Sequence, residues 1–249
     1  MSKSNLAVKE EMEEVVEEAI LPNATAKNNV RVMYNEKIKT KKKIIYKTIK
    51  RMIDIIGALI GTVLLIPVTK IIYFARKFSK EEQGPLFYEQ LRYGKNGKIF
   101  RLYKYRSMCI GADEKLKEYL ANNEEARKEF KKTHKLQDDP RITKIGNFLR
   151  KTSLDELPQV INILKGEMSF VGPRPVVKKE VEDYGKNKDK FLSVKPGLTG
   201  YWQVNGRSNT TYEERMKMEL YYVDNCSMWL DIKIFFKTFI TVFKKEGAV

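Results

Sequence analysis

Two adjacent carboxylates, Asp155 and Glu156, stand at the start of a short apolar stretch and could do chemistry together. Leucine, valine and isoleucine follow at helical spacing, which predicts a helix that begins near Ser153 to Glu156 and ends around Gly166. Ser153 with Glu156 three residues later also fits a capping box. Free amides and the positive helix end stabilise anions and should keep Asp155 ionised. An ionised carboxylate can accept a phosphoryl group.

Arginines flank this acid pair in the sequence. Arg150 precedes it, and Arg174 follows in residues 172–175 (Gly-Pro-Arg-Pro), where two prolines stiffen the backbone. Guanidinium groups suit phosphate oxygens. The plain alternative is that Asp155 and Glu156 only satisfy a helix dipole, as acids at helix starts commonly do. The neighbouring arginines favour the phosphate-binding interpretation.

The scarcity of histidine and cysteine narrows the chemistry further. The chain has one histidine, His134, and two cysteines, Cys109 and Cys226. A disulfide framework, a His/Cys zinc site and the Ser-His-Asp and Cys-His mechanisms are therefore excluded. Any acid, base or nucleophile must come from carboxylates, lysines, tyrosines or hydroxyls.

Three further segments give the elements around the acid pair. Residues 86–108 hold two β-prone aromatic runs around a Gly-Lys-Asn-Gly turn at residues 94–97, which predicts a hairpin. Residues 112–132 are rich in alanine, glutamate, lysine and leucine and predict one solvated helix without chemistry. Residues 201–204, between two glycine-containing turns, predict a short strand.

An apolar segment at residues 52–74 indicates a membrane. Its uncharged core, residues 55–69, is shorter than the roughly 20 residues that a spanning helix needs, and Pro67 favours a kink. Basic residues flank both ends, which places both on the cytoplasmic side. We therefore expect a re-entrant helix, with a single span and a buried helix of a soluble protein as alternatives.

Both ends of the chain carry amphipathic patterns. Residues 7–20 predict a short acidic helix. Near the C-terminus, lysines oppose an apolar helical face formed by Trp229, Ile232, Phe236, Phe239, Ile240 and Phe243. This face suits the membrane interface or the protein core, and the segment at residues 52–74 favours the interface. The net charge of +16 then matches anionic lipids, since no nucleic-acid-binding motif occurs.

Four segments, in order, resemble the bacterial sugar transferase family, the monotopic phosphoglycosyl transferases that act on polyisoprenyl phosphates. They are KRMIDIIGALIG with its proline, GPLFYEQLRYGKNGKIFRLYKYRSM, DDPRITKIGNFLRKTSLDELPQVINILKGEMSFVGPRP and KPGLTGYWQVNGRS. The resemblance covers about residues 50–249. It implies an α+β, membrane-associated (monotopic) catalytic domain with a re-entrant N-terminal membrane helix, a small β-hairpin and interfacial amphipathic helices.

The resemblance also implies an activity. A hexose 1-phosphate passes from a UDP-sugar, with UDP-galactose or UDP-glucose favoured, to undecaprenyl phosphate, and UMP is released. Asp155 would be the nucleophile, and Asp155 and Glu156 would hold Mg²⁺. The phosphate-binding residues would be Lys104, Arg106, Arg150 and Arg174. One departure is Ile66, where many members have serine before the membrane-helix proline.

We expect three parts of the chain: an N-terminal acidic helix and basic linker (residues 1–46), a re-entrant membrane helix (residues 47–80) and a cytoplasmic catalytic domain with the C-terminal amphipathic helix (residues 81–249). The resemblance bears on the second and third parts. It implies a place at the cytoplasmic face of the inner (plasma) membrane, in exopolysaccharide, capsule or O-antigen synthesis. UDP-sugar, undecaprenyl phosphate and membrane lipids would be the partners, with no nucleic acid and with a homo-oligomer left open. The alternatives are a non-catalytic membrane-surface adaptor and a glycosyltransferase that releases UDP.

Overall fold

A computed structural model describes residues 24–79, 84–133, 136–206 and 210–243. The chain divides into two units, Met1–Ile49 and Lys50–Val249. In the first unit, the described residues 24–49 are helical throughout. The acidic helix expected at residues 7–20 lies outside the described residues, as does His134.

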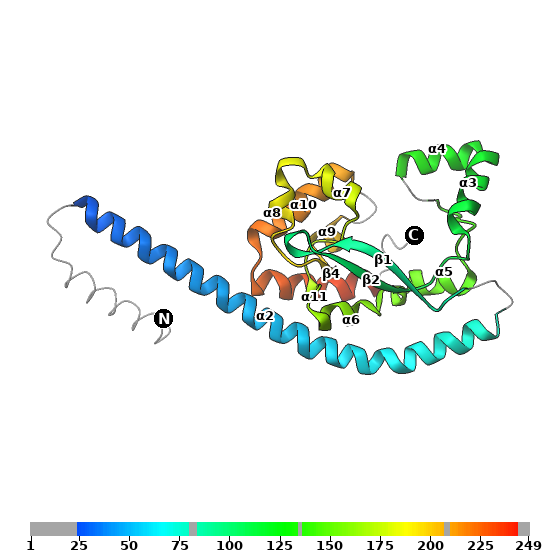
Figure 1. Cartoon of the computed structure of the whole chain (residues 1–249), viewed down its shortest axis with the longest axis horizontal. Coiled ribbons are helices and arrows are strands. Elements are labelled where there is room, and N and C mark those ends of the chain that lie inside the picture. The colour runs from blue at the N-terminus through cyan, green and yellow to red at the C-terminus, as the bar shows by residue number, and fades with distance from the viewer. Residues whose placement is uncertain (1–23, 80–83, 134–135, 207–209, 244–249) are drawn as a thin grey trace. The chain divides into compact units, whose positions relative to one another are not determined.

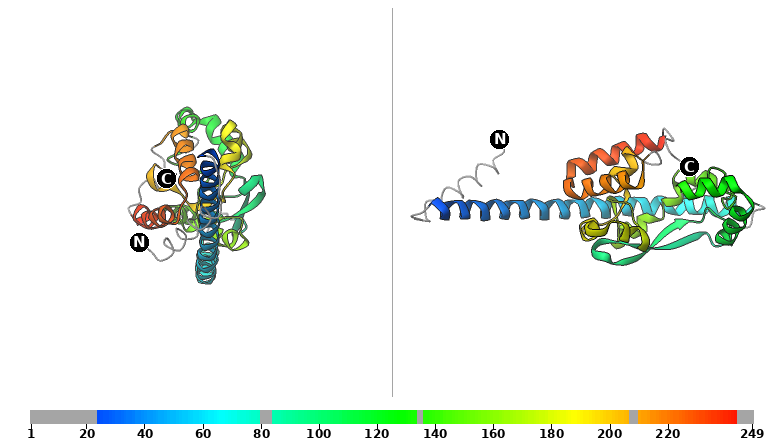
Figure 2. Two further views of the ribbon diagram at one scale, coloured as in Figure 1. Left: turned by 90° about the vertical axis from the view of Figure 1, so that its left-hand side faces the viewer. Right: turned by 90° about the horizontal axis from the view of Figure 1, so that it is seen from above.

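The described elements are mixed helices and short strands, as the sequence predicts for an α+β fold (Figure 1). In chain order they are α2 (Ala24–Lys77), β1 (Phe87–Tyr93), η1 (Lys95–Gly97), β2 (Ile99–Tyr105), α3 (Ala112–Asn122), α4 (Glu124–Thr133), α5 (Lys144–Lys151), η2 (Leu154–Glu156), α6 (Gln159–Lys165), β3 (Ser169–Val171), α7 (Lys178–Asp183), η3 (Gly185–Asn187), α8 (Lys188–Phe191), β4 (Gly197–Thr199), α9 (Tyr201–Asn205), α10 (Tyr212–Asn225) and α11 (Met228–Phe243). Both views of Figure 2 place α10 and α11 on one side of the second unit and the β1–β2 hairpin on the other.

The apolar segment lies in α2, and its stretch Thr40–Lys77 is long and apolar enough to cross a membrane. The helix continues through Pro67 without a break, although Figure 1 shows its axis curving along the cyan part. A proline removes one backbone hydrogen bond, which bends a helix without having to end it. From residue 52 onward, α2 leaves many large apolar side chains exposed, among them Val63, Leu64 and Ile66. The helix is therefore compatible with membrane association.

The part of α2 within the second unit is anchored to β3 by polar contacts. Asp54 is buried, and it accepts hydrogen bonds from the Ser169 hydroxyl and from the Phe170 backbone N–H, each at 3.0 Å. One turn later, Gly57 lets the Phe170 ring approach, since a Cβ at this position would lie 2.6 Å from that ring. This part of α2 is thus packed against β3 within the unit that carries the acid pair.

The predicted hairpin is confirmed. Strands β1 and β2 pair in antiparallel register from Phe87 opposite Tyr105 to Tyr93 opposite Ile99, around the turn at η1. Side chains alternate along β2, so that Phe100, Leu102 and Lys104 share one face. The first two are buried beside α6, and this register carries Lys104 toward the acid pair.

The helix expected to start between Ser153 and Glu156 begins later. Residues 154–156 form the 3₁₀ turn η2, and α6 starts at Gln159, directly after Pro158. Ser153 adopts a left-handed conformation with φ of 56° and its side chain caps nothing, so the predicted capping box is wrong. The predicted helix end is confirmed, because Gly166 forms a left-handed C-cap.

Two other predictions need correction. The single helix expected at residues 112–132 is split into α3 and α4 at Asn123, whose side chain accepts a hydrogen bond from the Ala126 N–H at 2.9 Å and so starts a second helix. Residues 201–204 belong to the helix α9 and not to a strand. The strand at this place is β4, which ends at Thr199 and pairs in parallel with β3.

Candidate active site

The acid pair lies on the 3₁₀ turn η2, between α5 and α6. Leu154, the first residue of this turn, packs against the core that Leu149, Val160 and their neighbours form. Asp155 retains 9% of its surface exposed, and about a quarter of the Glu156 side chain is accessible. The turn thus holds two carboxylates at the edge of the core, where one of them is almost closed off from water.

An ion pair ties Glu156 to the hairpin. Nζ of Lys104 lies 2.6 Å from Oε1 of Glu156. Burial acts to raise the pKa of Glu156, but the positive charges of Lys104, Arg174 and Arg92 outweigh it and hold that pKa below its usual value. Glu156 is therefore a permanently ionised carboxylate among cations.

Asp155 behaves differently from its neighbour. Burial raises its pKa from 3.8 to about 6, against the positive charges of Lys104 and Arg150. The sequence predicts that amides at the start of a helix keep this group ionised. The structure starts α6 only at Gln159, and a backbone hydrogen bond at Asp155 lowers the pKa less than the charges of Lys104 and Arg150 do. Asp155 is nevertheless mostly ionised at neutral pH, and it is a stronger base than an exposed aspartate.

A small pocket opens next to Glu156. Its lining residues are Arg92, Leu102, Lys104, Glu156, Gln159, Arg174, Pro175, Gly197, Leu198 and Gln203. Three of them are cations and one is a carboxylate, so the pocket has an excess of positive charge. This excess of positive charge favours phosphate oxygens at the opening of the pocket, whose own cavity is only about 10 Å³.

Two of these residues were missed from the sequence. Arg92 comes from β1 and is brought to the pocket because Tyr93 pairs with Val176, just after the Arg174 turn. Gln159 is buried at the start of α6. Nothing in the sequence marks Arg92, whereas Gln159 lies three residues after Glu156, within the same motif.

The other predicted cations lie at different places. Arg150, in the last turn of α5, acts electrostatically on Asp155. Arg106 does not line the pocket: its Nε donates to the carbonyl of Pro85 at 3.0 Å, and its guanidinium lies 5.5 Å from the centre of the Tyr88 ring. Arg106 thus lies outside this pocket, with its side chain against residues 85–88, and its phosphate-binding role stays a prediction.

The acid pair offers few metal ligands. Within the described ranges, no group of three or more histidine, cysteine, aspartate or glutamate side chains could hold an ion. Mg²⁺ commonly takes one or two carboxylates and completes its shell with water and substrate phosphates. The oxygen ligands of Asp155 and Glu156, beside a pocket for phosphate, fit that requirement.

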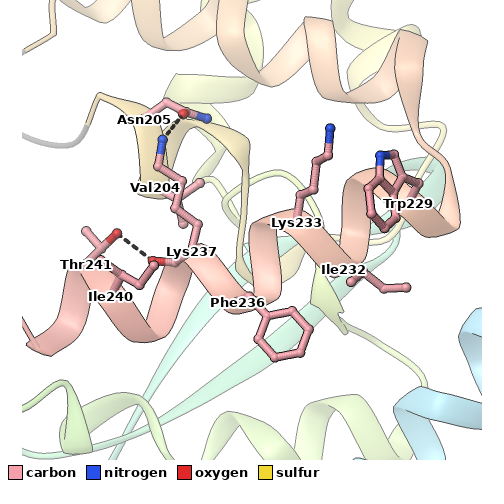
Figure 3. A pocket seen from close by; sticks show the side chains of 9 residues that line it. All are labelled: Val204, Asn205, Trp229, Ile232, Lys233, Phe236, Lys237, Ile240 and Thr241. Carbon is pink, nitrogen blue, oxygen red and sulfur yellow. Dashed lines mark hydrogen bonds between the residues drawn. The ribbon is translucent and has the colours of Figure 1, made fainter.

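A second hollow lies along α11, apart from the acid pair (Figure 3). This groove of about 830 Å³ is lined by Val204, Asn205, Trp229, Ile232, Lys233, Phe236, Lys237, Ile240 and Thr241. Trp229 and Phe236 are each about two thirds exposed. Lys233 lies 5.1 Å from the Trp229 ring centre, and Lys237 bonds to Asn205 at 2.6 Å. The groove combines exposed aromatic surface with lysines, as interfacial helices do.

Comparison with known proteins points to one family. The family profile described as "Bacterial sugar transferase" matches residues 45–245. The chain is 47% identical over 200 residues to the "Undecaprenyl-phosphate galactose phosphotransferase" of Salmonella typhimurium, which covers 80% of this chain and 41% of that protein. It is 40% identical over 206 residues to the "UDP-glucose:undecaprenyl-phosphate glucose-1-phosphate transferase" of Escherichia coli, covering 80% and 40%. It is 43% identical over 199 residues to the "Exopolysaccharide production protein ExoY" of Rhizobium meliloti, covering 80% and 87%. The chain thus spans about two fifths of the first two relatives and most of the third.

Proposed function

The chain belongs to the bacterial sugar transferase family, and from this premise we propose that it transfers a hexose 1-phosphate from a UDP-sugar to undecaprenyl phosphate and releases UMP. The observation that carries the proposal is Asp155, a buried carboxylate with a raised pKa beside a cationic pocket. The printed names of the Salmonella and Escherichia coli relatives describe this class of reaction. UDP-galactose and UDP-glucose are the favoured donors.

The proposed reaction has two displacements at phosphorus. A carboxylate oxygen of Asp155 attacks the phosphorus that bears the sugar, and the bond to the bridging oxygen breaks, so that UMP leaves with the electron pair. An oxygen of undecaprenyl phosphate then attacks the same phosphorus, and the bond to Asp155 breaks. The carboxylate returns, and the product is a sugar joined to the lipid by a diphosphate.

The chain's own cations stabilise the charge in both steps. Lys104 and Arg174 line the pocket and would contact phosphate oxygens, while Arg150 raises the positive potential at Asp155. Arg92 adds a fourth charge from the hairpin. Asp155 and Glu156 would hold Mg²⁺, which would neutralise negative charge on the donor diphosphate.

We also propose that α2 enters the membrane and returns, so that the reaction takes place at the cytoplasmic face of the inner membrane. The exposed apolar surface of α2 and the aromatic and lysine side chains of α11 support contact with the membrane. The return rests on the basic residues at both ends of the apolar segment and on Pro67, where the helix, continuous in the structure, would have to bend further. This placement brings the pocket within reach of a lipid phosphate and suits the first membrane step of surface polysaccharide synthesis. Lipids would then be partners of both helices.

The topology can be tested with single cysteines. In a background of Cys109→Ser and Cys226→Ser, Val30→Cys and Pro85→Cys are labelled with an impermeant thiol reagent in intact and inverted vesicles. A re-entrant helix predicts labelling of both positions from the same face. Labelling from opposite faces would show a single span instead.

The activity is tested by the nucleotide that purified protein releases with Mg²⁺, undecaprenyl phosphate and a panel of UDP-sugars. UMP that depends on one donor and disappears in Asp155→Asn is the expected result, with the exposed Asp138→Asn as matched control. UDP would indicate a glycosyltransferase. No nucleotide from any donor would favour the membrane-surface adaptor.

A further inference from the structure

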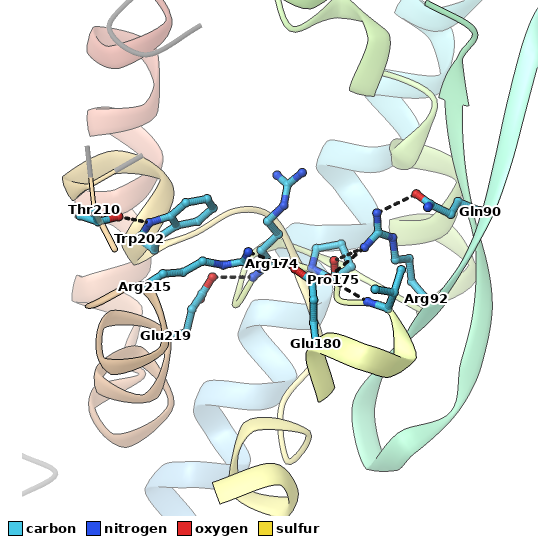
Figure 4. Close-up of polar contacts among 10 residues, drawn as sticks. Gln90, Arg92, Arg174, Pro175, Glu180, Trp202, Thr210, Arg215 and Glu219 are labelled. Atoms are coloured by element: carbon cyan, nitrogen blue, oxygen red, sulfur yellow. Dashed lines mark hydrogen bonds and ion pairs between the residues drawn. The ribbon is translucent and has the colours of Figure 1, made fainter. Parts of the chain in front are cut away.

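The buried carboxylate of Glu219 contacts the turn that carries Arg174. Glu219 lies on α10 with none of its surface exposed, and its Oε1 accepts a hydrogen bond from the backbone N–H of Arg174 at 3.0 Å (Figure 4). A buried carboxylate is costly unless hydrogen bonds or opposite charges replace its water. We propose that Glu219 is a positioning residue for donor binding and that it acts through Arg174. The inference rests on the proposed function, which assigns Arg174 to the donor phosphates.

The sequence of the turn makes this contact a strong constraint. Pro173 and Pro175 have no N–H, so Arg174 supplies the single backbone donor of residues 173–175, and Glu219 accepts it. On the other side of the turn, the carbonyl of Pro175 accepts a hydrogen bond from Nη1 of Arg92 at 3.4 Å. Side chains from α10 and β1 therefore hold the backbone on both sides of Arg174.

The guanidinium of Arg174 is left available for a ligand. It makes no hydrogen bond or ion pair with any part of the chain that the structure describes, and Figure 4 shows it pointing away from Glu219 and Arg215. It lines the pocket together with Glu156 and Lys104. A fixed backbone restricts the directions that a long arginine side chain can take, which lowers the entropy lost when the side chain binds an anion.

The groups that face Glu219 come from α10 and from the α7 region. They are Arg215 on its own helix, Glu180 on α7, and Tyr184 directly after α7, in addition to Arg174. Burial raises the pKa of Glu219 to about 7, against the Arg174 N–H and the charge of Arg215. A glutamine at this position would keep the shape and the acceptor oxygen and would remove the titrating charge, with an NH₂ group in place of Oε2. The hydrogen bond and the charge can therefore be tested separately.

Three variants separate the contact from general packing. Glu219→Leu removes the acceptor, Glu219→Gln keeps it, and Leu220→Ala removes core packing one residue away on the same helix without touching the hydrogen bond. The first readout is hydrogen exchange at the Arg174 amide in the full-length protein. Exchange should become faster in Glu219→Leu and stay as in wild type in the other two.

The second readout is steady-state UMP release. Glu219→Leu should raise KM for the UDP-sugar about tenfold and change kcat by less than about twofold. The reason is that it weakens the contact of Arg174 with the donor phosphates, and this contact stabilises the bound donor and the transition state equally. Glu219→Gln should have the wild-type KM, because it keeps the acceptor for the Arg174 N–H. In an Arg174→Ala background, Glu219→Leu should add nothing, since both changes remove the same interaction.

Several results would overturn the inference. Exchange of the Arg174 amide or a KM for the UDP-sugar that stays at the wild-type value in Glu219→Leu would do so. Faster exchange and a higher KM in Leu220→Ala would also do so. So would additive effects of Glu219→Leu and Arg174→Ala on KM. If wild-type protein releases no UMP from any donor, the proposed function fails. In that case the exchange of the Arg174 amide still decides whether Glu219 holds the turn.

Discussion

Lys104 Nζ and Glu156 Oε1 lie 2.6 Å apart, and this ion pair makes two neighbouring carboxylates unlike each other. Glu156 is held ionised by the lysine, whereas Asp155 forms no ion pair with any described residue and has a pKa raised to about 6. A nucleophile must be ionised but should not be strongly stabilised by a fixed partner. This difference supports the proposal that Asp155 is the nucleophile and Glu156 the supporting residue.

The raised pKa predicts how activity depends on pH. Because Asp155 must be ionised to attack phosphorus, kcat/KM for UMP formation should rise with pH through about 6 and then level off. The measurement is the initial rate of UMP release between pH 5 and 8 at constant ionic strength. A rate that is already level at pH 5, as an exposed aspartate with a pKa near 4 would give, would contradict the assignment.

Replacing Lys104 should move that midpoint. Burial raises the pKa of Asp155, and the positive charge of Lys104 is the largest effect that lowers it. Lys104→Met should therefore shift the acid limb of the profile to higher pH and lower the rate. Lys104→Arg keeps the charge and serves as the matched control. An unchanged midpoint in Lys104→Met would show that the limb belongs to another group.

Burying an ionised Asp155 should cost stability. Its folded-state pKa of about 6 lies above the ordinary 3.8, so the group favours the fold when protonated and that contribution is lost as pH rises through about 6. The difference corresponds to roughly 3 kcal/mol. Asp155→Asn should therefore unfold at a higher temperature than wild type at pH 8, with a smaller gain at pH 4. Differential scanning fluorimetry in detergent measures the unfolding temperature at each pH. An equal gain at pH 4 and pH 8 would contradict the raised pKa of Asp155.

Asn162 connects the helix behind the acid pair to the strand of Lys104. It is fully buried on α6, its Oδ1 accepts from the Tyr103 N–H at 3.1 Å, and its Nδ2 donates to the Arg101 carbonyl at 2.7 Å. Asn162→Leu leaves both backbone groups without a partner and should destabilise the protein by about 2 to 4 kcal/mol. Denaturant unfolding checks the value. The nearby exposed Lys165→Ala should cost far less, and equal losses would contradict the role of Asn162.

The sequence predicted the parts of this fold that depend on local chemistry. The glycines in residues 94–97 were enough to predict the hairpin, and Gly166 was enough to predict the end of α6. The acid pair and Arg174 were also identified from their motif, and the structure brings Glu156 and Arg174 to one pocket.

What the sequence did not reveal depends on competing local choices or on distant pairing. Asn123 offers a helix start inside an otherwise helical pattern, and the left-handed Ser153 delays α6 until after Pro158. Arg92 reaches the pocket only through the pairing of β1 with the segment beyond Arg174, across more than eighty residues of chain. Contacts of that range leave no periodic or spacing signal along the sequence.

The proposed mechanism depends most on Asp155 as the nucleophile that carries the phosphosugar. The direct measurement is a single-turnover reaction of purified protein with its UDP-sugar and Mg²⁺ in the absence of undecaprenyl phosphate. Covalent transfer predicts a rapid burst of UMP that approaches one equivalent of enzyme, and its complete loss in Asp155→Asn. UMP that forms only after the lipid phosphate is added, or a burst that survives in Asp155→Asn, would contradict the account.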